Sequence, residues 1–507
     1  MISLTPDNKR WSVIAVALSA MFSSACAIGP KYQKPVVAQT PPAFKEFTGN
    51  DEWKMAEPSD GFIRGKWWEI FEDPQLNALE ERVNINNQNV KQAEAQFRQA
   101  RALIIGAYAN YYPTIGSSPA ITQADSARAP HTTTFSLPIS ASWEPDLWGR
   151  VRLAVENAAD NAQVSAADLE NVRLAAQALL ATDYFLIAAS DMQTAVLKNT
   201  IEAYQKNLDL TNNRYNGGVA SKSDVTLAQT QLAGAKAQAT DLKIGRAQDE
   251  HAIAMLTGQA PASVSITAAQ INGPPPAIPL VVPSKLLERR PDIAAGERMV
   301  AAANANIGIA QTAYYPTLTL SASAGFASTS LQQLFNYASR SWSAGPGISE
   351  TLFDFGRRGA VLQGDIAAYD ATVAGYRQTV LAAFQEVEDD LASLRYLAEE
   401  AQQQQEAVTA AEISLALEID RYKAGTDSYL NVITTQTIAL TDEQTAVTLL
   451  QRRLVAAVDL VKAMGGGWDN STLPSLDQMR SKQMADPKNT QKVAQPAPPP
   501  VPPVTQN

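Results

Sequence analysis

The residue types that perform most enzyme chemistry are scarce in this sequence. Its 507 residues include two histidines, His131 and His251, and one cysteine, Cys26. Two neighbouring carboxylates, Asp389 and Asp390, lie in a stretch with a helical pattern, where adjacent side chains point in different directions. No nucleophile–base pair, phosphate-binding loop or metal-ligand spacing is visible in the sequence. The sequence therefore predicts a protein that is not an enzyme and has no catalytic residue, metal site or cofactor.

Two copies of an Arg-Tyr turn offer another kind of chemistry. Residues 214–230 read RYNGGVASKSDVTLAQT, and residues 421–437 read RYKAGTDSYLNVITTQT. Arg, Tyr, Gly, Ser, Val, Gln and Thr recur between the two at a constant offset of 207 positions. Glycine allows the left-handed turn that ends many helices. Arginine and tyrosine can hold neighbouring helices together through hydrogen bonds or ion pairs, and such contacts can also be released.

These turns belong to an internal duplication. The tetrapeptide YYPT occurs at 111–114 and again at 314–317, and LWGR at 147–150 is matched by DFGR at 354–357. Each copy reads in the same order: a helix, a strand region, a very long helix, the Arg-Tyr turn and a helix of roughly 35 residues. The chain is therefore predicted to hold two structural repeats.

The repeats divide the chain into segments. The first repeat covers 73–256 and the second covers 286–468, with a linker at 257–285 that contains GPPPAIPLVVP. The Pro-rich remainder at 469–507 is expected to be disordered or extended along the surface.

The long helices must be rods rather than parts of a globule. Residues 149–215 contain no proline, and neither do residues 356–422. Apolar residues in the second stretch fall at spacings of 4 and 3 from Val380 to Ala401, the pattern of a coiled coil. About 65 helical residues at 1.5 Å each span roughly 100 Å. This length predicts Ala-rich helices that pack against one another in a long bundle or tube.

The strand regions, about 114–145 and 317–355, alternate apolar residues with small polar ones. The clearest alternating runs are 134–144, 317–326 and 341–349. The pattern fits a transmembrane strand with lipid on one face and water on the other, and it also fits a half-buried soluble sheet. Pro138 and Pro346 predict local bends or bulges.

Each repeat thus supplies two strands, four in all, and the fold class is α+β with mainly long helices. Four strands cannot close a barrel, and an open sheet edge cannot face lipid. Small membrane barrels need about eight strands or more. A membrane-spanning version of this sheet therefore requires several copies of the chain, and three copies would supply twelve strands.

Composition excludes two classes of protein. The net charge is −10, from 41 basic and 51 acidic residues, and only 18% of residues are charged. A nucleic-acid-binding protein would need a basic face, so none is expected as a partner. No run of 18 or more apolar residues occurs, which excludes a polytopic helical membrane protein.

Residues 1–25 read as a secretory signal peptide. Two basic residues precede a short apolar stretch, WSVIAVALSAMF, and small residues follow it. Cys26 comes directly after them, as in a bacterial lipoprotein signal, although Ser23 stands where such signals usually have leucine. We therefore expect export and a covalent lipid on Cys26, at the start of an N-terminal segment covering 26–72. The alternative is a free thiol after ordinary cleavage nearby.

Taken together, landmarks spread over 26–468 match one family. They are CAIGPKYQKP at 26–35, WWEIFEDPQLNALEE at 67–81, YYPT twice, SWEPDLWGR at 142–150, LLERRPDIAAGE at 286–297 and both Arg-Tyr turns. In combination they resemble the TolC-type outer-membrane efflux channels, in the lipoprotein branch that includes OprM-like and NodT-like proteins.

The resemblance implies a passive homotrimeric conduit. Its twelve-stranded barrel would span the outer membrane and continue as an α-helical barrel in the periplasm, with a lipid anchor on Cys26 in the outer membrane. Its partners would be a periplasmic adaptor (membrane fusion) protein and an inner-membrane efflux transporter of the RND type. Small molecules, drugs or other toxic compounds, would be the cargo.

The resemblance also implies that the Arg-Tyr turns form a gated periplasmic tip that meets the adaptor. The positions carried over are Arg214, Tyr215, Gly217, Gly218, Asp224, Arg421, Tyr422, Gly425, Asp427, Asn431 and Thr434. Some relatives have acidic residues at the positions of Asn431 and Thr434, which this sequence lacks, and Asp427 could substitute. Three alternatives stay open: ordinary hairpin residues at the turns, a protein-secretion duct of the same fold, and a periplasmic coiled-coil scaffold.

Overall fold

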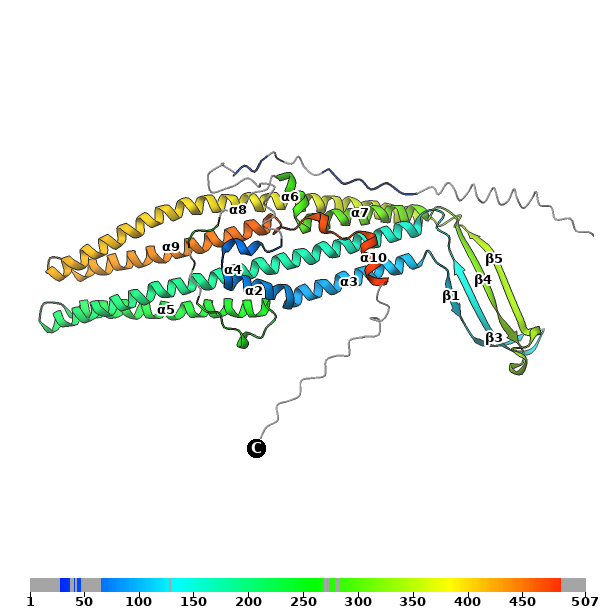
Figure 1. Cartoon of the computed structure of the whole chain (residues 1–507), viewed down its shortest axis with the longest axis horizontal. Coiled ribbons are helices and arrows are strands. Elements are labelled where there is room, and N and C mark those ends of the chain that lie inside the picture. The colour runs from blue at the N-terminus through cyan, green and yellow to red at the C-terminus, as the bar shows by residue number, and fades with distance from the viewer. Residues whose placement is uncertain are drawn as a thin grey trace, which may run out of the picture.

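The computed structural model describes residues 28–36, 41, 43–46, 65–126, 129–268, 271, 273–276, 278 and 283–484. The described chain forms an elongated rod of helices with a β-sheet at one end (Figure 1). The signal peptide at 1–25, Cys26 and the chain after 484 lie outside the described residues. What the sequence predicts for those segments therefore stays a prediction.

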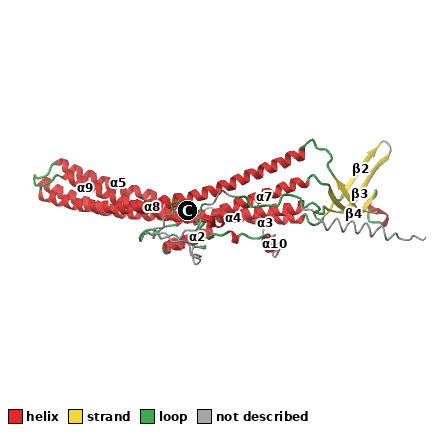
Figure 2. Ribbon diagram, turned by 90° about the horizontal axis from the view of Figure 1, so that it is seen from above, coloured by secondary structure: helices red, strands yellow, loops and turns green. Residues whose placement is uncertain are grey.

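Two helical hairpins build most of the rod (Figures 1 and 2). α4 (Arg150–Asn216) has 67 residues and α8 (Arg357–Ala424) has 68, and they turn back into α5 (Lys222–Leu256) and α9 (Tyr429–Ala463), of 35 residues each. The two predicted long helices, α4 and α8, are confirmed. Neither of them contains a proline that would interrupt its hydrogen bonds. α4 contains a window apolar enough to cross a membrane, but 67% of that window is buried inside the bundle, as in a core helix.

Shorter helices pack against the long ones. They are α2 (Pro74–Asn86), α3 (Gln88–Ala109), α6 (Pro283–Arg289), α7 (Pro291–Thr312) and α10 (Leu476–Met484), with the 3-10 helices η2 (Trp67–Phe71), η3 (Pro261–Ser263), η4 (Leu331–Gln333), η5 (Tyr337–Ser339) and η6 (Asn470–Thr472). Asp73 caps α2, since its carboxylate accepts the amide N–H groups of Gln75 and Leu76 at 2.8 and 3.1 Å. In the second repeat α7 takes the place of α3 beside its long helix.

The sheet holds four antiparallel strands, as predicted. The first consists of two segments, β1 (Thr114–Ser117) and β2 (Ala120–Ser126), which both pair with β3 (Ala129–Trp143). β3 pairs with β4 (Thr317–Ser328), and β4 pairs with β5 (Arg340–Ser349). Within the described chain, β1, β2 and β5 therefore each present an edge that no other strand covers.

Two prolines lie inside the strands without shifting the register. Pro138 lies opposite Gly325 in an unbroken pairing with β4, although the pairing of β3 with the first strand is interrupted there, between Ser136 and Ile139. Pro346 sits in an uninterrupted pairing. The bulges predicted at these prolines are therefore wrong, and a register shift occurs instead in β2. Gly325 provides the reason in the first case. A Cβ at this position would overlap the carbonyl oxygen of Leu137, so only glycine fits beside the proline.

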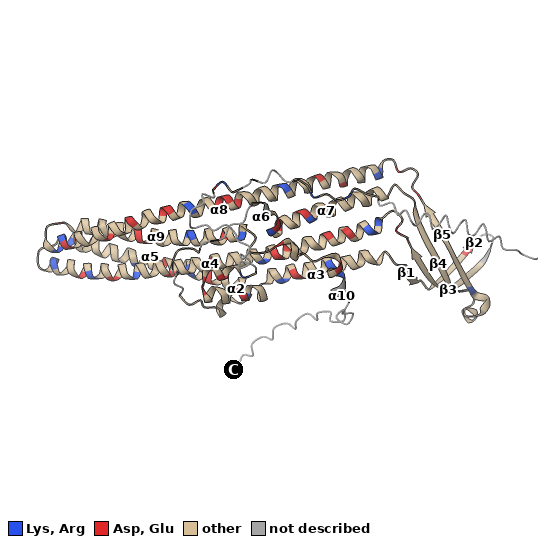
Figure 3. Ribbon diagram, turned by 45° about the horizontal axis from the view of Figure 1, so that its top comes forward, with Lys and Arg blue, Asp and Glu red and all other residues tan. Residues whose placement is uncertain are grey.

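The two faces of the sheet differ in polarity. Adjacent rows across β3, β4 and β5 read Ile139–Ala324–Trp342 on one face and Ser140–Ser323–Ser343 on the other. Figure 3 shows acidic and basic residues spread over the helices, while the strands are almost free of them. Trp342 is 82% exposed in the single chain, so the apolar face is open, as a lipid-facing surface would be.

The main hydrophobic core lies near the middle of the rod, around η2 and α2 (Figure 1). Trp67 and Trp68 are each 1% exposed, and their rings pack edge to face with centres 6.0 Å apart. Ile266 and Ile278 of the linker are buried in the same core. Where it is described, the linker is therefore packed against the repeats.

The segment after the second repeat is ordered further than predicted. The expectation of a disordered or extended tail from 469 is wrong for 469–484, which contains η6 and α10. Met479 is 2% exposed and packs with Ile104 and Ala162. The guanidinium of Arg101 donates to the Met479 carbonyl oxygen at 2.8 Å. This buried side chain and this charge-assisted hydrogen bond help hold the tail against α3 and α4.

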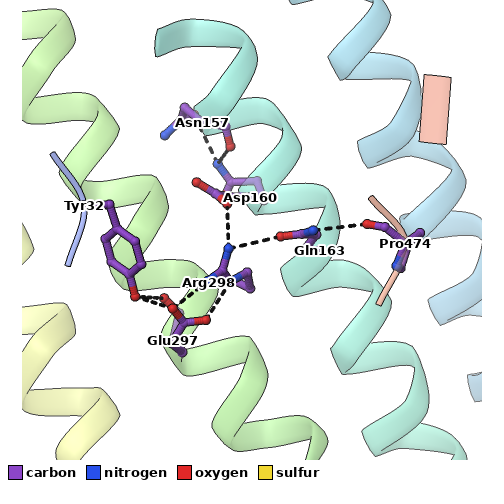
Figure 4. A network of polar contacts seen from close by, with 8 residues as sticks. Tyr32, Asn157, Asp160, Gln163, Glu297, Arg298 and Pro474 are labelled. Carbon is purple, nitrogen blue, oxygen red and sulfur yellow. Dashed lines mark hydrogen bonds and ion pairs between the residues drawn. The ribbon is translucent and has the colours of Figure 1, made fainter. Parts of the chain in front are cut away.

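A polar network fastens both ends of the described chain to the same pair of helices (Figure 4). The Tyr32 hydroxyl donates to the Glu297 carboxylate on α7, and the next residue, Arg298, reaches Asp160 on α4 at 3.4 Å. Gln163, also on α4, donates to a tail carbonyl oxygen at 3.1 Å. Burial raises the pKa of Asp160 to about 7, against the opposing effect of Arg298. The N-terminal segment and the tail are therefore linked through side chains of α4 and α7.

Candidate gate at the helical tip

The two Arg-Tyr turns lie together at the end of the rod opposite the sheet (Figures 1 and 2). Gly218 between α4 and α5 has a φ of 74°, and Gly425 between α8 and α9 has a φ of 77°. These equivalent glycines thus make the left-handed turn in both repeats. Gly217, to which the sequence assigns the same role, has a φ of −79°, which does not require glycine.

Arg214 of the first turn reaches across to the second hairpin. Its Nη1 donates to the carbonyl oxygens of Tyr422 at 2.8 Å and Lys423 at 3.4 Å. Its guanidinium carbon lies 4.5 Å from the centre of the Tyr422 ring. The two carbonyl groups belong to the last turn of α8, where the regular helical ladder runs out of donors. Arg214 therefore caps a helix of the other repeat and puts a positive charge at its negative end.

An aromatic cluster lies directly beneath this contact. Tyr422 is 6% exposed, and its ring centre is 5.2 Å from that of Tyr429 on α9. The hydroxyl groups of Thr211 and Tyr422 are 3.5 Å apart. Burial, with Tyr422 and Tyr204 nearby, raises the pKa of Tyr429 to about 12. Tyr429 therefore stays uncharged at neutral pH, and the cluster forms a small core shared by both hairpins.

The equivalents of Arg214 and Tyr422 in the opposite turns, Arg421 and Tyr215, point outward. Arg421 has a side chain that is 61% exposed and pairs with Glu418 on its own helix at 2.7 Å. Tyr215 is 41% exposed, with the Nζ of Lys222 5.5 Å from its ring centre. A single chain therefore brings together Arg214 and Tyr422, but it leaves Arg421 and Tyr215 at the surface.

Asp427 and Asn431 act together in the second turn. The Asp427 carboxylate accepts the amide N–H of Ser428 at 2.7 Å and the side-chain amide of Asn431 at 2.6 Å. The bond from Ser428, together with the side-chain bonds, holds the pKa of Asp427 below its ordinary value. Asp427 is therefore charged at neutral pH, at the exposed end of the rod.

The other two predicted tip residues serve the helices on which they lie. Asp224 and Ser221 form a capping box at the start of α5, with reciprocal bonds of 2.9 and 3.1 Å. The hydroxyl of Thr434 donates to the carbonyl oxygen of Leu430 within α9 at 2.9 Å. Both are contacts of an ordinary helical hairpin.

Sequence reasoning missed three residues of the aromatic cluster: Tyr204, Thr211 and Tyr429. The seven-residue spacing of Tyr204 and Thr211 puts both on one face of α4, and that signal is present in the sequence. Their packing against the other repeat depends on how the two hairpins lie in space, for which the sequence holds no local signal.

Comparison with known proteins supports one family. The family model described as outer membrane efflux protein matches residues 79–259 and 282–466. The chain is 30% identical over 480 residues to the probable efflux pump outer membrane protein TtgC of Pseudomonas putida, covering 91% of this chain and 96% of that protein. The antibiotic efflux pump outer membrane protein ArpC, also of Pseudomonas putida, has the same identity and coverage.

A solved structure shares the fold along nearly the whole described chain. The outer-membrane channel OprN matches with a TM-score of 0.81 at 28% sequence identity, over 87% of this chain and 100% of that chain. The segments matched by the family model contain both Arg-Tyr turns and all four strands.

Proposed function

Because the chain belongs to the outer membrane efflux protein family, we propose that three copies of it form a duct through which small toxic molecules leave the cell. The chain is the outer-membrane channel of an efflux pump and not an enzyme. Its sheet spans the outer membrane, and its helices extend into the periplasm. Relatives are named for antibiotic, toluene and solvent efflux, which favours drugs or other toxic compounds as cargo here.

The open sheet is the observation that carries the trimer proposal. Its two outer edges, on β1–β2 and on β5, have no partner strand within the described chain. Each backbone N–H or C=O group left unpaired in lipid costs several kcal/mol. An open strand edge leaves a row of such groups, so it cannot face lipid. Three copies joined edge to edge make twelve strands and leave no open edge. The Ser-rich face would then line a water-filled lumen, with the apolar face toward lipid.

The contact between Arg214 and Tyr422 supports a gate at the tip. It joins the two hairpins of one chain through a hydrogen bond to a charged group, typically worth about 1.5–3 kcal/mol. Binding of a partner protein can supply that much energy, so the hairpins could separate when the adaptor docks. We assign the gate to Arg214 and Tyr422, and adaptor contact to the exposed tip residues Tyr215, Arg421 and Asp427.

The N-terminal segment supports a lipid anchor on Cys26. Along α7 it contacts first Glu297, then Asn304, whose side chain donates to a backbone carbonyl of the segment at 3.0 Å. Gly29 then packs on Gly308, four residues before the end of α7. Cys26 precedes Gly29 by three residues, so a lipid there would attach near the level of the membrane. Metabolic labelling with palmitate tests this, since the variant Cys26→Ser should lose the label.

Membership of the family supports a proposal for the pump partners. An outer-membrane efflux channel needs an energy source elsewhere, and we propose a periplasmic adaptor and an RND-type transporter in the inner membrane. Crosslinking at Tyr215 or Arg421 in cells would capture the adaptor. A secreted polypeptide trapped along the lumen would favour the protein-secretion duct instead.

Fractionation combined with conductance tests the whole proposal. A heat-resistant trimer in the outer-membrane fraction that conducts ions in planar bilayers is the expected result. Expression should also restore drug resistance in a strain that lacks its own channel but keeps the adaptor and transporter. A soluble periplasmic monomer would contradict the proposal.

A further inference from the structure

The chain carries an internal template for its contact with the next copy. α3 packs on α4, α4 on α7, and α7 on α8, in one row beside the sheet (Figure 1). The contact of α4 with α7 joins the first repeat to the second. In a closed ring the outer face of α8 meets the outer face of α3 from a neighbour, which joins the second repeat to the first. The two junctions are therefore equivalent through the duplication.

The internal junction rests on three layers near the sheet. Trp148 stacks on Tyr315 with ring centres 5.0 Å apart, and its Nε1 donates to the Pro316 carbonyl oxygen at 2.6 Å. Leu153 fits against Gly308, where a Cβ would come within 2.8 Å of its Cδ1.

The third layer is polar. Asn157 donates to the side-chain oxygen of Asn306 at 3.1 Å and to the Ala302 carbonyl oxygen at 2.8 Å. Each layer thus pairs one residue near the start of α4 with one near the end of α7.

Five of the six equivalent positions on the outer faces are exposed, the sixth, Ile105, is partly exposed, and the pairs are complementary in size. Adding 207 to the α4-side residue of each layer gives its equivalent in the second repeat, and subtracting 203 from the α7-side residue gives its equivalent in the first. The three equivalent pairs are Phe355 with Tyr112, Ala360 with Ile105, and Gly364 with Leu103. Phe355 is 90% exposed, Leu103 is 63% exposed and Tyr112 is 59% exposed in the single chain. In the second layer the large residue changes sides, from Leu153 on Gly308 to Ile105 on Ala360. In the third layer Gly364 leaves room for Leu103.

We propose that Phe355, Ala360 and Gly364 on one chain form the docking site for Tyr112, Ile105 and Leu103 of a second copy. This seam rests on the trimer proposed above and goes beyond it by naming the residues of contact. The seam lacks one bond of its template. The Phe355 side chain has no N–H group, so it cannot donate to the Pro113 carbonyl oxygen as the Trp148 side chain does to that of Pro316.

Paired cysteines test the seam. Leu103→Cys with Gly364→Cys should yield covalent dimers and trimers when a short bismaleimide is added to outer membranes. The matched pair Asn157→Cys with Asn306→Cys should crosslink within one chain only. Leu103→Cys with Leu381→Cys should not crosslink, because Leu381 lies 17 residues, roughly 25 Å, further along α8. Each single-cysteine variant controls for the native Cys26.

The outcomes separate the seam from the trimer. Native mass measurement of the same samples reports the number of chains. One outcome overturns the seam but not the trimer: the mass is that of a trimer, the Asn157–Asn306 cysteine pair crosslinks within chains, and the Leu103–Gly364 cysteine pair does not crosslink between chains. A monomer in that measurement overturns both.

A gain of function provides the second test. Phe355→Trp should raise the temperature at which the trimer dissociates in detergent, because tryptophan can donate to Pro113 of the neighbour. Phe355→Ala should lower that temperature. The monomer should fold in both cases, since Phe355 is 90% exposed in the single chain. An unchanged dissociation temperature in Phe355→Ala overturns the seam.

Discussion

The guanidinium of Arg214 caps the carbonyl end of the helix that carries Tyr422, 208 positions away in sequence, at a distance of 2.8 Å. The same group lies 4.5 Å from the centre of the Tyr422 ring. Arg421, the equivalent of Arg214, is instead largely exposed. The arginine of the first turn therefore contacts the other hairpin of its own chain, whereas the equivalent arginine of the second turn lies exposed and pairs within its own helix.

Loss of the Arg214 side chain should loosen the tip. Arg214→Met removes both the donor and the charge, so we expect a higher open probability in planar bilayers. Arg214→Lys should fall between Met and the native residue, because an ammonium keeps the charge but lacks the planar guanidinium that lies over the Tyr422 ring. Lys206→Met, an exposed change on the same helix, should behave as the native channel does. Equal open probability for all four channels would rule out Arg214 as a gate residue.

Glu80 should make stability depend on pH. It is 0% exposed, and neither carboxylate oxygen has a hydrogen-bond partner in the described chain. Burial raises its pKa well above the ordinary value of 4.5. The folded state therefore keeps a proton that the unfolded state releases, so stability falls as pH rises above about 4.5, the unfolded pKa. Glu80→Gln should remove this slope and be the more stable form at pH 8, with little difference at pH 4.

Thermal denaturation in detergent across that pH range checks the prediction. Glu81→Gln is the matched control. Glu81 is partly exposed and pairs with the exposed Lys66, so its loss should change stability little. A native channel whose stability does not fall between pH 4 and pH 8 would argue against a buried proton on Glu80.

Gly465 should not tolerate a side chain. It has a φ of 90°, and a Cβ would overlap the carbonyl oxygen of Arg289. Gly465→Ala should therefore lower the melting temperature, because the turn after α9 must move away from the start of the second repeat. Gly234→Ala, in the middle of α5 with open space around it, should raise stability by up to about 1 kcal/mol. If the two variants melt alike, the overlap at Gly465 is not a constraint.

Met479 should hold the tail in place. Met479→Ala empties the site between Ile104 and Ala162, at a cost of about 2 kcal/mol or more. Because few contacts hold α10, we expect the tail to detach locally while the bundle stays folded. Trypsin cleavage at Arg480 should become faster, and Met255→Ala, at a residue 62% exposed, should leave the rate unchanged. Cleavage at the native rate in Met479→Ala would contradict this role.

Local features of the sequence determine much of this protein. Stretches without proline determine the two long helices, because nothing interrupts their hydrogen bonds. Period-2 alternation from Phe135 to Trp143 determines a strand with two unlike faces. The offset of 207 positions makes the repeats visible, and the glycines equivalent at 218 and 425 determine where the hairpins turn.

The tertiary structure decides which partner each of these residues meets. Helical periodicity shows which side of α4 is apolar, but it does not show whether α7, α9 or another chain covers that side. Arg214 and Arg421 have the same sequence surroundings and opposite environments, because only Arg214 faces a second hairpin of its own chain. For the same reason only the tertiary structure reveals that α3 and α4 bury Met479 of the tail. Such long-range contacts arise from packing, for which local sequence carries no signal.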